Sequence, residues 1–199
     1  MSPRPDVSEQ RKDQILDAAA TVFAKKGVHE SRMDDIVEKS GLSKGSLYWY
    51  FKSKDEILLG IFERIFSREF VELEKLTGVD GTASECLSLF TDIVIQDVNR
   101  MLRLMPIAYE FLSLAFRRKI FQDAFKIYIN KYMDIMLPII QQGIDSGEFR
   151  DISALEVGIA IGSIIEGTIL LWVYDKNLVN PETHIRSGIN LLLSGIKTR

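Results

Sequence analysis

A run of basic and hydroxyl residues between Lys39 and Lys54 has the composition of a surface that contacts phosphate groups. Its sequence, KSGLSKGSLYWYFKSK, holds four lysines and no acidic residue, in a chain whose formal net charge is -3. One short helical pattern ends before Gly41, and a second begins at Lys44. Two short helices joined by a Gly-containing turn of three or four residues are typical of a helix-turn-helix, whose second helix enters the major groove of DNA. The segment therefore predicts binding to double-stranded DNA.

The second of these helices, expected at about 44–50, divides its residues between a packed face and an exposed one. Leu47 and Phe51 lie four residues apart and share one face, which we assign to the protein core. Ser43 precedes the helix as an N-cap, and Gly45 lets the backbone approach DNA closely. The residues expected to contact DNA from this helix and its flanks are Ser43, Lys44, Gly45, Ser46, Tyr48, Trp49, Lys52 and Lys54.

Almost every other segment has the apolar periodicity of an α-helix, and no segment alternates in the way of a strand. Helices are expected at about 8–26, 33–40, 44–50, 53–76, 83–103, 106–116, 118–146, 153–174 and 181–197. Pro106 suits a first helical turn, whereas Pro138 lies inside a helical pattern and is expected to kink it. The sequence thus predicts an all-α protein, with a DNA-binding domain at 8–54 and a further helical domain at 55–199.

Other classes of function find little support. The two histidines are far apart, and there is no H-E-x-x-H motif, nucleophile elbow or phosphate-binding loop, so we expect no enzyme. A single cysteine, Cys86, excludes an intramolecular disulfide framework and a cysteine-based zinc site, and no metal or cofactor is predicted. The N-terminus lacks an apolar signal core, which favours a cytoplasmic protein. The most apolar stretch, 157–173, is interrupted by Glu166 and is interpreted as a buried helix rather than a membrane span.

Residues from about Gln10 to Leu59 resemble the TetR family of transcriptional regulators. The aromatic run at 48–51 is particularly specific for that family, and the match extends at fixed spacing over four helices. The matching residues are Ile15, Ala18, Ala19, Phe23, Gly27, Asp35, Ile36, Gly41, Ser43, Lys44, Gly45, Leu47, Tyr48, Phe51, Lys54 and Leu58.

The resemblance implies a homodimer that binds a near-palindromic operator and usually represses transcription. It also implies that the N-terminal three-helix helix-turn-helix domain is followed by a helical ligand-binding and dimerisation domain, where a small molecule lowers operator affinity. One departure lies before the second helix, where the family usually has a Thr pair and this chain has Ser31 and Arg32. Ser31 can keep the hydroxyl cap and Arg32 can add a phosphate contact, and which of them caps is left open. We therefore add Ser31, Arg32 and Met33 to the expected DNA-binding set.

The middle helices are rich in aromatic residues and methionines, most of which we assign to packing. Polar groups in such surroundings carry more information, because burying them is costly unless they are satisfied. Glu166, in an apolar stretch, is expected either to point into a ligand cavity or to hydrogen-bond across a dimer interface. A carboxylate among aromatics would suit a hydrophobic or cationic compound. The expected ligand-binding residues are Asp97, Met101, Tyr109, Glu110, Phe125, Tyr128, Tyr132, Glu166 and Trp172.

The last two helices carry small residues that permit close helix approach, and the resemblance implies that they pair across the dimer. The expected dimerisation residues are Gly158, Gly162, Ile165, Ile169 and Ile189. The helix at about 53–76, roughly 35 Å long at 1.5 Å per residue, joins the two domains and is the expected lever between ligand and operator. Two alternatives stay open. One is that the regulator is ligand-independent or controlled by another protein. The other is that it activates transcription instead of repressing it.

Overall fold

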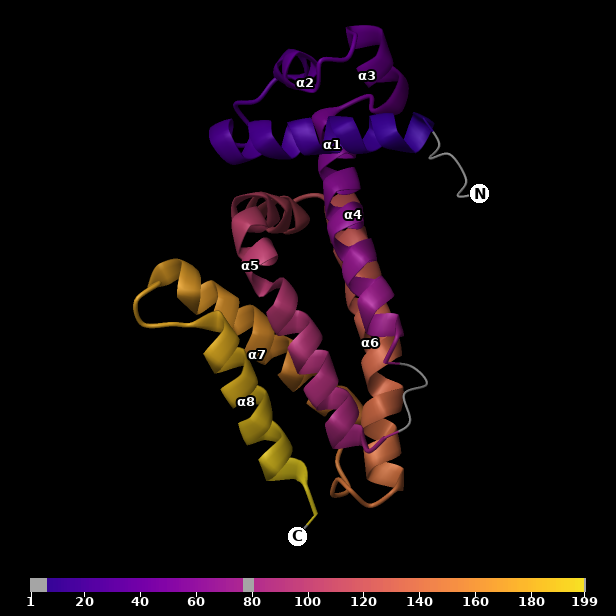
Figure 1. Ribbon diagram of the computed structural model, residues 1–199, viewed down its shortest axis with the longest axis vertical. Coiled ribbons are helices and arrows are strands. Elements are labelled where there is room, and N and C mark those ends of the chain that lie inside the picture. Colours follow the sequence, from indigo (N-terminus) through magenta and orange to yellow (C-terminus); the bar gives the residue numbers. More distant parts are fainter. Residues whose placement is uncertain (1–6, 77–80, 199) are drawn as a thin grey trace. The chain divides into compact units, whose positions relative to one another are not determined.

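The computed structural model describes residues 7–76 and 81–198, without the side chains of 68, 69, 97, 99–101 and 103. Within this part the fold is all-α, as predicted, and holds no strand. Figure 1 labels the helices in chain order. They are α1 (Val7–Lys26), α2 (Met33–Ser40), α3 (Lys44–Tyr50), α4 (Lys54–Glu74), α5 (Ala83–Ala115), α6 (Lys119–Asp145), α7 (Ala154–Tyr174) and α8 (Pro181–Ile196).

One expected helix boundary is wrong. The helices predicted at 83–103 and 106–116 form the single helix α5, which continues through Pro106. A proline inside a helix removes one hydrogen bond and clashes with the preceding turn, but buried apolar residues on both sides keep the segment helical. Among these, Val98 and Ile107 are almost fully buried. α6 likewise runs through Pro138.

The chain forms two compact units that are each built from separate segments. Unit 1 contains the chain up to Ser67 together with Leu104–Lys126, and unit 2 contains Arg68–Arg103 and Ile127–Arg199. The expected DNA-binding domain, 8–54, lies wholly in unit 1. Within that unit, α1 lies across the pair formed by α2 and α3 (Figure 1).

The DNA-binding helices share their core with two later segments of unit 1. The buried cluster that contains Leu47 of α3 also contains Ile107 and Phe111 of α5 and Phe121 of α6. The Phe111 ring stacks on that of Phe62 in α4, with centroids 3.8 Å apart and an interplanar angle of 7°. Stacked rings and buried aliphatic groups stabilise this unit through apolar area removed from water. The helix-turn-helix therefore rests on a core to which residues after 103 contribute.

Unit 2 is closed by the turn between α6 and α7. The carboxylate of Glu148 in this turn accepts hydrogen bonds from the backbone N–H groups of Ala83 at 2.8 Å and Ser84 at 3.0 Å, which begin α5. These are donors that a helix leaves unpaired in its first turn. A Cβ on Gly143 would lie 2.4 Å from the Phe149 ring, so only glycine lets this aromatic pack against α6. The turn thus joins the start of α5 to the end of α6.

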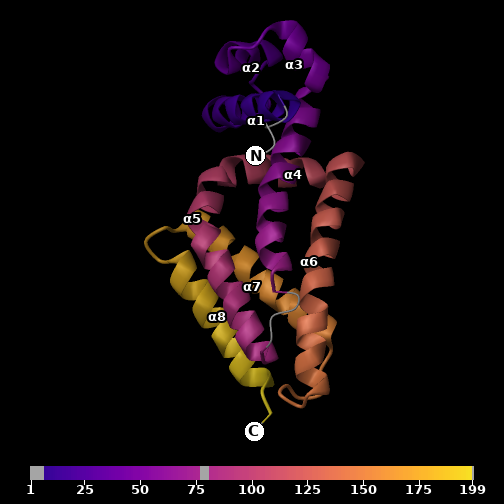
Figure 2. The same cartoon turned by 45° about the vertical axis from the view of Figure 1, so that its right-hand side comes forward.

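The apolar helix α7 has the length and hydropathy of a membrane span, but one of its faces belongs to the core of unit 2. Gly188 of α8 packs against the Ile164 side chain of α7, and the two helices run side by side in Figures 1 and 2. The other face is apolar and open to solvent. The expectation of a buried helix is therefore wrong for this face, whose exposed residues include Leu155, Ile159, Leu170 and Tyr174.

Candidate functional site

The turn between α2 and α3 has the backbone geometry of a helix-turn-helix. Gly41 ends α2 in the left-handed region, at φ 68°, and its N–H points to the carbonyl oxygens of Val37 and Glu38. Glycine adopts this conformation without the steric cost that a Cβ would impose. Ser43 then caps α3 by accepting a hydrogen bond from the backbone N–H of Ser46 at 3.1 Å. The prediction that Ser43 is the N-cap is confirmed.

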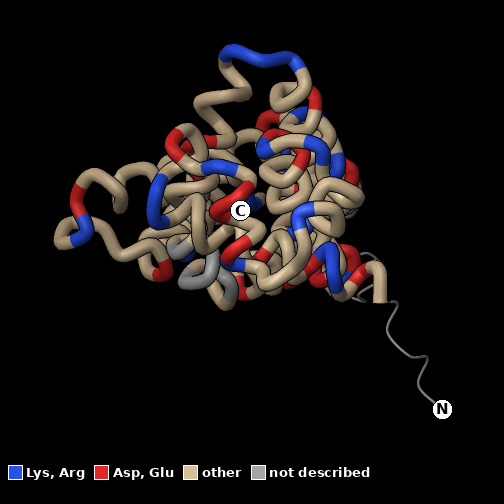
Figure 3. Tube along the Cα trace, turned by 90° about the horizontal axis from the view of Figure 1, so that it is seen from above, with Lys and Arg blue, Asp and Glu red and all other residues tan. Residues whose placement is uncertain are grey.

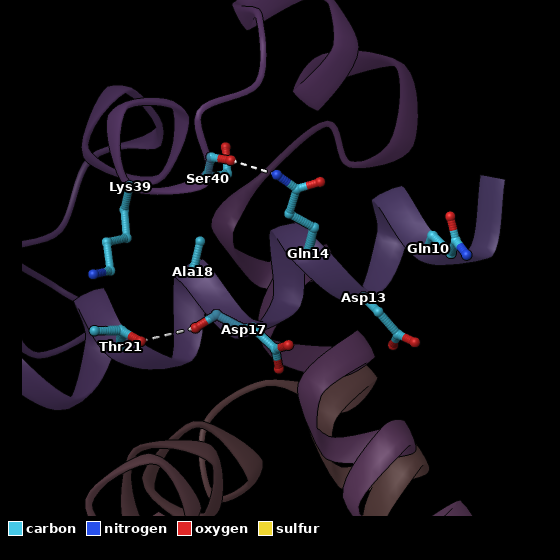
Figure 4. A pocket seen from close by; sticks show the side chains of 8 residues that line it. All are labelled: Gln10, Asp13, Gln14, Asp17, Ala18, Thr21, Lys39 and Ser40. Carbon is cyan, nitrogen blue, oxygen red and sulfur yellow. Dashed lines mark hydrogen bonds between the residues drawn. The ribbon is translucent and has the colours of Figure 1, made fainter. Parts of the chain in front are cut away.

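α1 holds the end of α2 through a direct hydrogen bond. The side-chain amide of Gln14 donates to the carbonyl oxygen of Ser40 at 2.7 Å, as Figure 4 shows. Both residues also line an open groove of about 540 Å³ on the surface of α1 and α2. The groove is lined by Gln10, Asp13, Gln14, Asp17, Ala18, Thr21, Lys39 and Ser40. Because Ser40 directly precedes the turn, Gln14 fixes where α3 begins.

α3 presents two faces, as its spacing predicts. Leu47 is fully buried and Phe51 is 5% exposed, so both anchor the helix in the core of unit 1. Trp49 is 68% exposed, and its ring meets that of Tyr50 edge to face, with centroids 4.5 Å apart. An indole left in water at this level is unusual unless it meets a partner. The exposed face of α3 thus offers an aromatic surface beside its basic first turn.

Most of the residues expected to contact DNA lie at the surface of unit 1. Arg32, Ser43, Lys44, Gly45, Trp49 and Lys52 are exposed, and Met33, Ser46 and Tyr48 are half-buried. The ammonium group of Lys44 lies 2.7 Å from the Asp34 carboxylate, and this hydrogen bond raises the Lys44 pKa. Lys44 is therefore a cation at any physiological pH. Figure 3 shows short basic and acidic segments interspersed along a trace that is mostly uncharged.

Two predicted DNA contacts have their polar groups directed into the protein. Ser31 is 2% exposed and its hydroxyl donates to the carbonyl oxygen of Gly27, so the idea that it caps α2 is wrong. Lys54 is half-buried, and its ammonium group donates to the carbonyl oxygens of Val28, His29 and Ser31 at 2.6, 2.9 and 2.6 Å. Three such bonds use all the donors of a lysine. Both residues shape the turn before α2 instead of offering a group to a phosphate.

The start of α2 is secured by an acidic residue that the expected set did not include. Arg32 occupies the N-cap, and its backbone N–H donates to the Asp35 carboxylate at 2.8 Å. Lys26 donates to the other carboxylate oxygen, also at 2.8 Å. The bond from Lys26, followed by the one from Arg32, lowers the Asp35 pKa. Since Asp35 performs the capping, the Arg32 guanidinium stays exposed.

The residues expected to bind a ligand divide between the two units. Tyr109, Glu110 and Phe125 lie in unit 1, while Tyr128, Tyr132, Glu166 and Trp172 lie in unit 2; the side chains of Asp97 and Met101 fall outside the described ones. In unit 1, a Cβ on Gly27 would lie 3.7 Å from the Glu110 carboxylate. The Phe125 ring lies 6.0 Å from that of Phe62. Phe125 therefore packs beside the DNA-binding core.

In unit 2, Tyr132 and Glu166 belong to adjoining parts of α6 and α7. The Tyr132 hydroxyl donates to the Gly158 carbonyl oxygen at 3.4 Å, and its ring lies against Gly162. Glu166 follows Gly162 by one helical turn and is reached by solvent. The surrounding protein nevertheless removes enough water from its carboxyl to raise the pKa. Further along α7, the ring of Trp172 contacts the Lys176 ammonium group, which lies 4.8 Å from the ring centroid.

The expected dimerisation residues are mostly inside a single chain. Gly158, Ile165, Ile169 and Ile189 are buried in unit 2, and Gly162 is half-buried against Tyr132. These positions lie on the inward face of α7 and α8 and are not part of the exposed apolar face of the two helices. The apolar residues left exposed include Leu155, Ile159, Leu170, Leu171 and Tyr174 of α7, Leu178 of the loop that follows it, and Leu191 of α8.

Comparison with known proteins agrees with this geometry. The family model described as "Bacterial regulatory proteins, tetR family" matches residues 15–61. The chain is 30% identical to the HTH-type transcriptional repressor KstR2 of Mycolicibacterium smegmatis, over 73% of this chain and 72% of that protein. It is 28% identical to the fatty acid metabolism regulator protein of Bacillus subtilis, over 94% and 95% of the two chains. The crystal structure of the transcriptional regulator FadR from B. subtilis in complex with stearoyl-CoA superposes with a TM-score of 0.74 at 26% identity, covering 92% and 98% of the two chains.

Proposed function

Because the chain belongs to the TetR family of bacterial regulatory proteins, whose members bind DNA through a helix-turn-helix, we propose that it represses transcription as a homodimer and leaves its operator when a small hydrophobic molecule binds. The observation that carries the proposal is the capped, exposed α3, which Leu47 and Phe51 anchor in a buried core. This helix is short, anchored and basic at its first turn, and the N-terminal residues of a recognition helix are those that contact base edges in the major groove. We assign DNA binding to 8–54, and ligand binding and dimerisation to 55–199.

The exposed apolar face of α7 and α8 supports a dimer. An exposed patch of this kind marks an interaction surface, and closed two-fold dimers are the commonest oligomers. Two copies related by a two-fold axis would cover the face and present two α3 helices. A dimer of this form reads a near-palindromic operator, since the two half-sites mirror the symmetry of the protein.

An acyl-CoA ester is the first ligand to test. The solved FadR structure contains stearoyl-CoA, and the similarity to the B. subtilis regulator extends over nearly the whole chain. The raised pKa of Glu166 means that its carboxyl is charged over a narrower range of pH than that of an ordinary glutamate.

Coupling between ligand and operator is supported by the composition of the unit 1 core. Ile107, Phe111 and Phe121 lie beyond the DNA-binding helices in sequence but pack in the same cluster. Arg118, directly before α6, also forms an ion pair with Asp55 of α4 at 2.6 Å. A ligand that favours another arrangement of α5 and α6 would therefore shift the DNA-binding helices, and by linkage it would bind the DNA-free state more tightly. We therefore propose that residues 104–126, together with α4, transmit the effect of the ligand to the DNA-binding helices.

The test is binding of the purified protein to DNA from upstream of its own gene and the neighbouring genes, measured by fluorescence anisotropy. We expect sequence-specific binding that is released by a long-chain acyl-CoA, and not by free coenzyme A at the same concentration. Specific binding that no acyl-CoA or cationic dye relieves would support the ligand-independent alternative. Binding of equal strength to every duplex would contradict the operator function itself.

A further inference from the structure

Asp34 faces the recognition helix from the first turn of α2. Its Oδ1 lies 2.7 Å from Nζ of Lys44, and the two side chains are 69% and 62% exposed. Both helices belong to unit 1, and the pair lies on the surface that carries the predicted DNA contacts. Phosphate groups repel a carboxylate at such a surface, so an acid there weakens binding to every sequence unless it makes a contact of its own.

The neighbouring Asp35 caps the start of α2, whereas Asp34 has no part in this cap. Asp35 binds the Arg32 backbone N–H and the Lys26 ammonium group. A negative charge in the first turn also suits the helix dipole, which accounts for acidic residues at either position. The dipole does not explain why Asp34 is directed to the one lysine in α3. An exposed ion pair contributes little to stability, so its use is better sought in binding.

The chemistry of base recognition gives the pair a use. In the major groove, lysine donates to O6 and N7 of guanine, and aspartate accepts from the N4 amino group of cytosine. α3, KGSLYWY, contains no Arg, Asn or Gln, so Lys44 is its one strong donor for a base edge. Guanine O6 and cytosine N4 are hydrogen-bonded to each other at about 2.9 Å. The donor and acceptor of the pair are 2.7 Å apart, which matches that separation.

We propose that Asp34 is a specificity-determining residue, and that Asp34 and Lys44 read one G·C base pair in each half-site as a unit. Lys44 donates to guanine while Asp34 accepts from the paired cytosine. Their contact in the free protein orients both side chains before DNA arrives, and it draws Lys44 away from a non-specific phosphate contact. The inference rests on the proposed function, since it requires a DNA operator.

The test begins with selection of duplexes from a randomised library by the wild-type protein. We expect one G·C pair per half-site whose change to A·T weakens wild-type binding by about tenfold. In the Asp34→Ala variant, and likewise in Lys44→Ala, the same change should weaken binding by less than about threefold. The matched control is Glu38→Ala, which removes an exposed acid one turn along α2. It should keep the base preference and bind all duplexes slightly better.

A base analogue isolates the contact of Asp34. Replacing the paired cytosine by 2-pyrimidinone removes its N4 amino group, and we expect this to weaken wild-type binding but not that of Asp34→Ala. If Asp34→Ala binds all duplexes better and keeps the full preference, as Glu38→Ala does, Asp34 is only an acid near DNA and the proposal is overturned. A preference lost in Lys44→Ala alone overturns it as well. Failure of the wild-type protein to enrich any sequence would instead contradict the operator function, and a circular dichroism melt shows that each variant is folded.

Discussion

Nζ of Lys54 lies 2.6 Å from the carbonyl oxygen of Ser31, so the first residue of α4 ties down the turn that precedes α2. Two further carbonyl oxygens of that turn accept from the same ammonium group. A basic residue in a DNA-binding segment is therefore occupied inside the protein. The main role of the Lys54 ammonium group is therefore to hold the turn before α2 in place, and not to attract DNA.

Replacing Lys54 by Ala should lower the free energy of unfolding by about 1–3 kcal/mol, because carbonyl oxygens in the turn lose their donor. Urea denaturation of the purified variant measures this. Lys52→Ala is the control, since that side chain is exposed and its ammonium group donates to one carbonyl oxygen, that of Tyr48, against three for Lys54. It should cost less stability than Lys54→Ala and lower the salt dependence of DNA binding by about one phosphate contact. Equal stability of the two variants would show that the Lys54 bonds do not hold the turn.

The Glu148 cap gives a second prediction. Glu148→Ala removes the acceptor for two N–H groups at the start of α5 and should cost about 1 kcal/mol of stability. Glu148→Gln keeps one acceptor oxygen and should cost less. Thermal melts followed by circular dichroism compare both with Asp151→Ala, which removes an exposed acid nearby. An equal effect of Asp151→Ala would assign the loss to net charge.

The recognition helix is tested by the double variant Lys44→Ala with Tyr48→Ala. Loss of a cation and an aromatic contact should weaken operator binding by about 2–4 kcal/mol. Both side chains reach the surface of unit 1, so the dimer should stay intact in size-exclusion chromatography. Unchanged affinity for the selected operator would remove α3 from the interface.

Two isoleucines on opposite faces of α7 separate assembly from folding. Ile159 is 50% exposed and Ile161 is fully buried. Ile159→Asp should give a folded monomer, because the charge is placed on the face proposed to pair. Ile161→Asp should unfold unit 2, since an unpaired charge in a core costs several kcal/mol. Light scattering and circular dichroism measure the two outcomes, and a dimer that survives Ile159→Asp would contradict the proposed interface.

The raised pKa of Glu166 predicts that the stability of the protein depends on pH. Its folded-state pKa is raised above the ordinary 4.5, so the folded protein holds this proton more tightly than the unfolded chain. The stabilisation is therefore present at low pH and is lost as pH rises from about 4.5 through the folded pKa. In Glu166→Gln this loss should vanish, so the melting temperatures of variant and wild type should diverge across that range. Parallel curves from pH 4 to 8 would contradict it.

Much of the fold was predictable, because helices and turns depend on local sequence. The helical periodicity, the Gly41 turn and the Ser43 cap follow from steric and hydrogen-bonding preferences of a few neighbouring residues. Leu47 and Phe51 were placed correctly in the core, since spacing of four residues selects one face of a helix. The continuation of α5 through Pro106 was missed because it depends on packing in both compact units.

The sequence by itself determined that this chain is all-α and carries a helix-turn-helix whose second helix has a basic first turn, because residue type and spacing are sufficient for both. The tertiary structure decided which polar groups are free. It directed Lys54 and Ser31 inward and Asp34 toward Lys44, and it placed the outward apolar face of α7 at Ile159 instead of Ile165. Such choices depend on contacts between residues that are distant in the chain, and a helical repeat cannot distinguish two apolar faces until one of them is packed.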